Sequence, residues 1–201
     1  MTDKKVAVLI DGGHLRVLAK HANISYTADL IEKVAHACIG KDEEPLRFLY
    51  YDCAPYRGTV KLPVSGTSHT FEGSDEWLGK LETKDLFAVR RGILKFRGWQ
   101  PKKRPVENKT LTDADFGPDF EQKGVDMRIG LDVATYSSAR LVQRLILITG
   151  DTDCVPAMKH ARKLGVQVVL VSFPPKRPPN ELVCHSDFKR QISWPNVSLE
   201  M

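Results

Sequence analysis

The stretch LITGDTDCVPAMKHARKLG (residues 147–165) joins an apolar run to a segment of helical periodicity through a turn that carries two acids. The apolar run starts at residue 144 and is short and unbroken, as expected of a strand buried on both faces of a parallel sheet. A helix is predicted from about residue 153 to residue 164. Asp151 and Asp153 lie in the turn, and like charges so close repel one another unless a cation lies between them. The turn is therefore a candidate cation site.

Apolar runs and amphipathic segments alternate along the rest of the chain. We predict strands at residues 5–10, 46–52, 92–99, 144–149 and 166–172. We predict helices from Thr27 to Gly40, at residues 77–90, 123–138 and 153–164, and a short closing helix at 181–192. Residues 54–74 are interpreted as a long connection of the kind that is often a lid, and residues 100–122 as a polar loop without periodicity. Strands alternating with helices predict the α/β class, with a mostly parallel sheet covered by helices on both faces.

Length and composition are those of a globular domain. We expect residues 1–201 to form one domain, with a core at about residues 6–172 and a C-terminal extension at 173–201. No apolar run approaches the ~20 residues of a membrane span, and Asp11 interrupts the first one, so we expect a cytoplasmic protein without a membrane partner. The four cysteines form no C-x-x-C pair, which argues against structural zinc and a disulfide framework. The net charge of +5 is a modest bias towards polyanions.

Acids follow two of the predicted strands directly. Asp11 ends the first strand, and Asp151 follows the strand at residues 144–149. In an open parallel sheet, ligands bind outside the carboxyl ends of the strands, so these acids face one crevice if their strands are neighbours. Carboxylate oxygens suit Mg²⁺ or Mn²⁺, and such an ion can lower the pKa of a bound water so that it attacks phosphorus. Each acid alone can be interpreted as a helix cap or a turn former, and only the combination favours a metal site.

Three blocks of the sequence, LIDGGHL, KGVDMRIGLDVA and LITGDTDCVPAMKHARKLG, resemble the motif blocks of the NYN domain, in the LabA-like or DUF88 branch of the PIN-like superfamily. The resemblance runs from about residue 6 to residue 172. It implies a three-layer α/β/α sandwich and a divalent-metal-dependent ribonuclease that uses Mg²⁺ or Mn²⁺. By position, it implies metal-binding and catalytic roles for the first-strand acid, the helix-start acid and the acids of the GD-x-D block, which are Asp11, Asp126, Asp151 and Asp153.

Two further positions in these blocks are candidate substrate contacts. His14 stands where the DG-x-N form of the family has asparagine, and Thr149 stands where serine is frequent. A histidine at this position would make activity sensitive to pH near its ordinary pKa of about 6.5. Asp132 also belongs to the second block, but on a regular helix it points well away from Asp126, so we expect at most a supporting role for it.

One segment, KFRGWQPKKRP at residues 95–105, interleaves cations with aromatic rings. Cations can follow a phosphate backbone while bases stack on the rings, so we predict that the segment contacts single-stranded RNA. The alternative is a solvated basic loop whose tryptophan belongs to the core. Lys123, just ahead of Asp126, is a further candidate contact, and Lys176 with Arg177 forms a weaker second patch. The candidate contacts within the segment are Lys95, Arg97, Trp99, Lys102, Lys103 and Arg104.

Together these features predict an endoribonuclease that cleaves single-stranded RNA through a metal-activated water. The first alternative is a catalytically weak or inactive RNA-binding or regulatory module of the same fold, which His14 favours. A phosphatase or phosphotransferase of small molecules is the second, although DGGH lacks the second acid of a D-x-D nucleophile block. A homodimer stays an open alternative.

Overall fold

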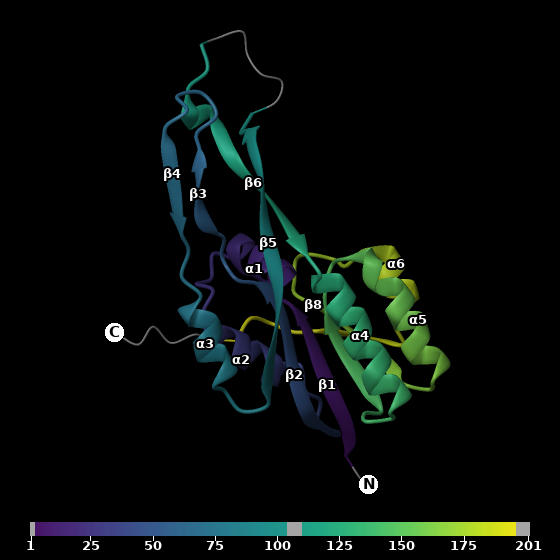
Figure 1. Ribbon diagram of the computed structural model, residues 1–201. Coiled ribbons are helices and arrows are strands. Elements are labelled where there is room, and N and C mark those ends of the chain that lie inside the picture. The colour runs from purple at the N-terminus through teal and green to yellow at the C-terminus, as the bar shows by residue number, and fades with distance from the viewer. Residues whose placement is uncertain (1–2, 104–109, 196–201) are drawn as a thin grey trace.

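Seven strands form the central sheet of the computed structural model, which describes residues 3–103 and 110–195 (Figure 1). Their order across the sheet is β6-β5-β2-β1-β7-β8-β9. Neighbouring strands of this sheet are parallel, except that β5 and β6 are antiparallel. The strand bounds are β1 (Lys4–Asp11), β2 (Glu43–Cys53), β5 (Phe87–Pro101), β6 (Phe116–Lys123), β7 (Arg144–Ile148), β8 (Gln167–Ser172) and β9 (Phe188–Gln191). The predicted α/β class with a mostly parallel sheet is confirmed.

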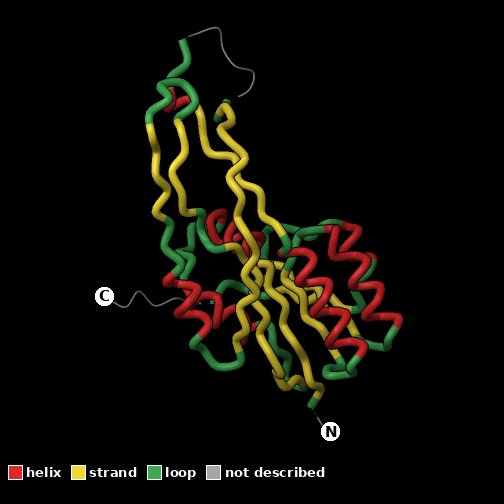
Figure 2. Tube along the Cα trace, viewed as in Figure 1, coloured by secondary structure: helices red, strands yellow, loops and turns green. Residues whose placement is uncertain are grey.

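Helices cover both faces of this sheet and give three layers (Figures 1 and 2). One face carries α1 (Gly12–His21), α2 (Ala28–Ala37) and α3 (Glu76–Glu82), and the other carries α4 (Val125–Ser138), α5 (Val155–Lys163) and α6 (Asn180–Cys184). Alternate residues of a strand point to opposite faces, so a strand covered on both sides is apolar throughout. None of the helices in the described part of the chain is both long and apolar enough to cross a membrane.

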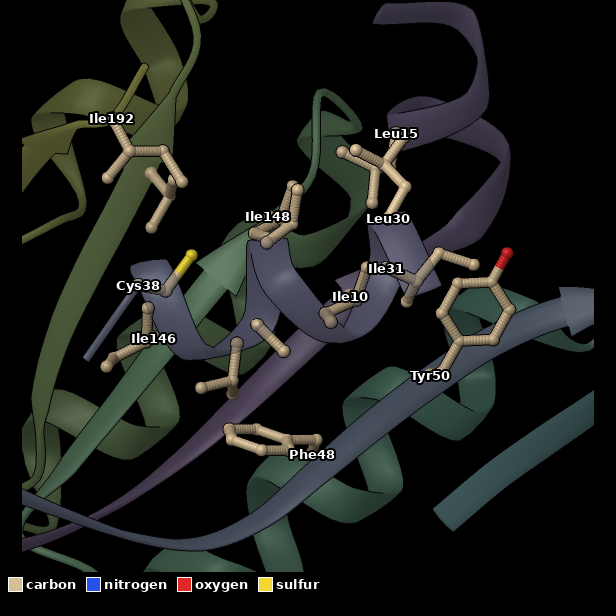
Figure 3. Packing of buried hydrophobic residues seen from close by; sticks show 14 of the residues in the cluster. Ile10, Leu15, Leu30, Ile31, Cys38, Phe48, Tyr50, Ile146, Ile148 and Ile192 are labelled. Carbon is tan, nitrogen blue, oxygen red and sulfur yellow. The ribbon is translucent and has the colours of Figure 1, made fainter. Parts of the chain in front are cut away.

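The core beneath α1, α2 and α3 fixes the start of α1 against the end of β1. Figure 3 shows Ile10 of β1 close to Leu15 of α1 and to Leu30 and Ile31 of α2, with Tyr50 of β2 beside them. All five side chains are completely buried. Burying a side chain of this size contributes roughly 1.5–3 kcal/mol, so the position of α1 is strongly held.

The helix α1 is absent from the prediction because two consecutive glycines disfavour a helix by propensity. The structure shows why glycine is required at its first position. A Cβ on Gly12 would lie 2.3 Å from the hydroxyl oxygen of Tyr50 and 2.7 Å from Asp52 Oδ2. The close approach of the two backbones therefore outweighs the low helix propensity. By contrast, α2 starts where predicted, because Thr27 Oγ1 accepts a hydrogen bond from the N–H of Leu30 at 3.1 Å.

A long arm, formed by two hairpins, projects from the body of the molecule (Figures 1 and 2). One hairpin is the extension of β5 and β6, and the other pairs β3 (Arg57–Lys61) with β4 (Ser68–Glu72). The hairpins pack on one another through aromatic rings whose centroids are 5.4–6.0 Å apart. These rings belong to Tyr56, Phe71, Phe96, Trp99 and Phe120. The segment at residues 54–74 is thus largely a hairpin with its own apolar contacts.

Three predicted elements are wrong in part. The helix predicted at residues 77–90 ends at Glu82, and Leu86 takes a left-handed φ of 65° just before β5 starts. The polar loop predicted at residues 100–122 contains β6, whose alternation is obscured by Gly117 and Pro118. The closing helix predicted at residues 181–192 is divided between the short α6 and the edge strand β9.

A buried ion cluster, the Glu43 cluster, ties three strands together at the end of the sheet where β1 begins. The side chain of Glu43 in β2 has no exposed surface and pairs with Arg144 of β7 and Arg190 of β9, the latter at 2.8 Å. Burial alone would raise the pKa of Glu43, but hydrogen bonds from Arg190, the Gly40 N–H and Arg144 outweigh it and lower the pKa to about 2.

The Glu43 cluster gives a pH-dependent contribution to stability. The unfolded chain has the ordinary glutamate pKa of 4.5 and the folded chain a pKa of about 2. The contribution is therefore fully present above about pH 4.5 and is lost as the pH falls towards 2. We expect the difference in urea-unfolding free energy between wild type and Glu43→Gln to shrink over this range and to stay constant from pH 5 to 7. A difference that is the same at pH 2.5 and pH 7 would contradict this assignment.

Candidate active site

The carboxyl ends of β1 and β7 meet at one edge of the sheet. The two strands are parallel neighbours with Ile10 opposite Ile148, so the residues that follow them lie side by side. Thr149 Oγ1 donates to Asp11 Oδ2 at 3.3 Å and accepts from the Asp151 N–H at 3.0 Å. Thr149 thereby connects the first-strand acid to the turn after β7.

Asp11 is a partly buried carboxylate with other acids nearby. Its Oδ1 accepts the His14 N–H at 3.0 Å, which caps α1. Burial raises the pKa of Asp11 above its ordinary value, and the negative charges of Asp151 and Asp52 raise it further, while the hydrogen bonds from His14 and Thr149 oppose the shift. Such an environment disfavours the ionised carboxylate and favours a bound cation.

Asp126 lies near the same edge but belongs to α4, on the face of the sheet opposite to α1. It lies in the first turn of α4, as predicted, after Gly124, whose φ of 78° suits a residue without a side chain. Burial raises the pKa of Asp126, followed by the charges of Asp151 and Asp11 and, more weakly, of Asp153. Asp126 therefore lies within electrostatic reach of the other three predicted acids, although the four come from three separate parts of the chain.

The turn after β7 uses one of its two acids as a cap. Asp151 accepts the N–H of Asp153 at 2.9 Å at the start of the short turn Thr152–Cys154. The side chain of Asp153 is exposed and serves no such cap. Capping thus accounts for Asp151 alone, and the second acid has no comparable structural explanation.

The donor set fits a hard divalent cation that keeps part of its water shell. All four side chains offer carboxylate oxygens, and the pKa values of Asp11 and Asp126 are raised by burial and then by their negative neighbours. Over residues 3–103 and 110–195, no three Asp, Glu, His or Cys side chains are already arranged as direct ligands. Mg²⁺ usually binds through one or two carboxylates and retains several waters, so it does not require such an arrangement.

His14 is a neutral group packed against the turn. Its ring lies so close to Gly150 that a Cβ there would be 2.6 Å from the His14 Nδ1. Burial, and then the charge of Lys176, lowers the pKa of His14 to about 4. A pKa this low argues against the pH sensitivity near 6.5 that the sequence suggested, because such an imidazole is uncharged through that range.

A basic hollow lies next to the acids on the β8 side. It has a volume of about 340 Å³ and is lined by His14 and Thr149 and by Lys176 and Arg177. The sequence marked these two cations only as a weak second patch. The structure places them in one hollow with Thr149, whose hydroxyl donates to Asp11.

That predicted RNA-binding segment lies on the arm. Lys95 and Arg97 are exposed, whereas the rings of Phe96 and Trp99 pack inside the arm, and the Trp99 Nε1–H donates to the Lys61 carbonyl at 2.7 Å. Both rings are half-buried, so the contacts within the arm occupy part of their surface, and Trp99 belongs to the ring cluster of the arm and not to the core beneath the helices. Among the other predicted contacts, Lys102 donates to the Ala114 carbonyl, Lys103 is exposed, Lys123 pairs with Glu121 at 3.5 Å, and Arg104 lies outside the described residues.

Sequence reasoning missed a buried polar group beside Asp11. Asp52, at the end of β2, is 1% exposed. It accepts hydrogen bonds from the Tyr50 hydroxyl at 2.8 Å and from the Cys53 N–H at 2.8 Å, and it forms an ion pair with Arg16 of α1. Its charge is thus neutralised within the protein. The only sequence signal was its position after a predicted strand, and Arg16 lies on a helix that was not predicted.

Asp132 has a structural role. Its Oδ2 accepts the Tyr51 hydroxyl and the Arg90 Nε–H, both at 2.9 Å. This carboxylate therefore ties α4 to β2 and β5, which agrees with the expectation that it is not a ligand.

Two comparisons relate this chain to known proteins, one by structure and one by sequence. A solved structure of a protein of unknown function from Vibrio parahaemolyticus is similar to this one, with a TM-score of 0.56 and 14% sequence identity over 94% of this chain and 93% of that chain. This likeness shows the fold alone. No curated protein matches the sequence.

A family model described as NYN domain matches residues 5–189, which is most of the chain and includes all four acids. The chain therefore belongs to the NYN domain family.

Proposed function

We propose that this protein is an endoribonuclease that depends on Mg²⁺ or Mn²⁺ and cleaves single-stranded RNA in the cytoplasm. NYN domains are generally nucleases of the PIN-like superfamily, which supports hydrolysis of phosphodiester bonds. The single observation that carries the proposal is that the parallel strands β1 and β7 bring Asp11 and Asp151 together through Thr149, with Asp126 and Asp153 close to the same edge of the sheet. We also propose that the chain belongs to the LabA-like branch of the NYN domain family.

The chain's own groups hold the reacting parts in place. Asp11, Asp126, Asp151 and Asp153 would hold the ion, which when bound polarises a phosphoryl oxygen and lowers the pKa of a water. Thr149 orients Asp11 and the Asp151 backbone through its hydroxyl. The neutral His14 ring offers a nitrogen to a phosphate or a water without adding a charge. Lys176 and Arg177 attract the phosphate backbone towards the acids.

Replacing Asp151 tests this proposal. We expect wild type to cut a labelled single-stranded RNA with Mg²⁺ or Mn²⁺ and to lose cleavage in EDTA. Asp151→Asn should cleave about 100-fold more slowly or worse, because it removes a negative charge where the cation binds. Asp132→Asn is the matched control, since it changes an acid of α4 that binds Tyr51 and Arg90 instead. Cleavage that is indifferent to EDTA and to Asp151→Asn would discard the proposal.

A second candidate function is an RNA-binding module of the same fold with little or no turnover. It is favoured by the observation that, within the described ranges, no three ligand side chains are already converged. It is also favoured by His14 in place of the family's asparagine. Tight binding of RNA without cleavage in Mg²⁺ or Mn²⁺ would support this function and exclude the first.

A further inference from the structure

A second hollow adjoins the acids on the side opposite Lys176 and Arg177. This α1–arm cavity has a volume of about 630 Å³ and is lined by Arg16 of α1, Trp77 of α3, and Phe120 and Gln122 of β6, among others. Two of its lining residues, Phe120 and Gln122, belong to β6, the strand that runs from the arm back to the body (Figure 1). Its volume is within the range of about 300–1,000 Å³ that is usual for small-ligand sites.

Gln122 places the cavity directly beside the first acid. A Cβ built on Gly13 would lie 3.4 Å from both Gln122 Oε1 and Asp11 Oδ1, so the amide and the carboxylate are neighbours across this glycine. Asp52, which also lines the cavity, is close enough to Asp11 to raise its pKa. A nucleotide whose phosphate lies at the acids can therefore reach the cavity with the base attached to it.

The walls combine aromatic surface with fixed polar groups. Trp77 packs edge-on against Tyr26 and Tyr50, with centroids 6.0 Å apart in each case, so its ring is held in one orientation. Arg16 is anchored by Asp52, and its guanidinium carbon lies 5.7 Å from the centroid of the Trp77 ring. A guanidinium has five N–H donors, more than Asp52 and Tyr50 accept, and the Gln122 amide both donates and accepts. This combination is complementary to a planar, polar heterocycle.

We propose that the α1–arm cavity binds the unpaired base of the RNA nucleotide next to the cleaved bond, an inference that rests on the proposed function. The base stacks on Trp77 or Phe120, and Arg16 and Gln122 bind its polar edge. Sequence-selective proteins commonly read unstacked bases in this way. A base within a duplex cannot turn into the cavity without breaking its pair, so the cavity also selects single-stranded RNA.

The cavity can be tested without cleavage by tryptophan fluorescence. The described chain has Trp77 in the cavity, Trp99 inside the arm and Trp194 stacked on Phe173 at 4.4 Å, on another part of the surface. In Mg²⁺, at least one of the four nucleoside 5′-monophosphates, which have no phosphodiester bond to cleave, should quench the emission of wild type. Trp194→Phe should keep this quenching and Trp77→Phe should lose it. Quenching that survives Trp77→Phe, or no quenching by any of the four, would overturn the proposal.

A second variant guards against a simple folding defect at Trp77. Gln122 is exposed, so Gln122→Ala should leave the melting temperature unchanged. This variant should bind the preferred monophosphate about tenfold more weakly, and its RNA cleavage should show a changed base preference. Gln100→Ala, which removes another exposed glutamine of the arm, should do neither.

The outcomes separate this inference from the nuclease proposal. Asp151→Asn should still bind the monophosphate, because Asp151 does not line the α1–arm cavity. If nucleotides bind but RNA is not cleaved in any divalent metal, the cavity proposal is supported and the nuclease proposal is wrong. If Gln122→Ala and Trp77→Leu cleave RNA with the rate and base preference of wild type, the nuclease proposal is supported and the cavity proposal is wrong.

Discussion

Asp11→Asn is expected to lower RNA cleavage about 100- to 1,000-fold while the metal-free protein stays as stable as wild type or becomes more stable. The loss of cleavage is expected because the change removes a charge from the proposed cation site. The stability follows from the raised pKa of Asp11, which means that the folded state disfavours the ionised carboxylate. Asparagine keeps an oxygen that can accept the His14 N–H and cap α1.

Thermal unfolding with and without metal measures both effects. In EDTA, the melting temperature of Asp11→Asn should equal or exceed that of wild type. Mg²⁺ should raise the melting temperature of wild type and raise that of Asp11→Asn much less, since a ligand stabilises only the state that binds it. A variant that melts earlier in EDTA and still cleaves RNA would show that Asp11 is a structural residue.

Glu43→Gln is expected to destabilise the protein by about 3–5 kcal/mol, the usual consequence of removing one partner from a buried ion pair. The amide leaves Arg144 and Arg190 close together without a negative charge between them. For a chain of this size the melting temperature should fall by roughly 6–20 °C. Glu44→Gln, at the exposed neighbouring position, should change it by only a few degrees.

The Glu43 cluster also allows a test of whether a change at one end of the sheet affects the candidate active site at the other end. Glu43 pairs in register with Lys4 at the start of β1, whereas Asp11 ends the same strand. At a temperature where Glu43→Gln is folded, we therefore expect its cleavage rate to equal that of wild type. A large loss of activity in the folded variant would mean that the two ends of the sheet are coupled.

The sequence predicts the parts of the site that depend on local pattern. Unbroken apolar runs identify β1 and β7, and each is followed by an acid, so Asp11 and Asp151 can be located from the residues alone. Asp126 follows from helical spacing and from the family resemblance. In each case the signal lies within about ten residues of the acid, where periodicity is informative.

The rest of the site depends on contacts between distant residues. The Gly-Gly start of α1 conceals a helix that is stabilised by packing on Tyr50 and Asp52, so Arg16 could not be placed. The strand β6 shows no clear apolar alternation, because Gly117 and Pro118 interrupt it, and its Phe120 ring packs against the second hairpin. Gln122 therefore comes close to Asp11 through a pairing of β5 and β6 that local periodicity does not reveal.

The position of β1 in the middle of the sheet also governs when the site can exist during synthesis. Asp11 and Thr149 are 138 residues apart in sequence yet joined by a hydrogen bond, and β7 cannot pair with β1 before it has left the ribosome. A nascent chain that ends before residue 149 holds only two of the four acids and lacks the strand that aligns them. If the finished protein is the ribonuclease proposed above, an incomplete chain is therefore not yet able to cleave RNA.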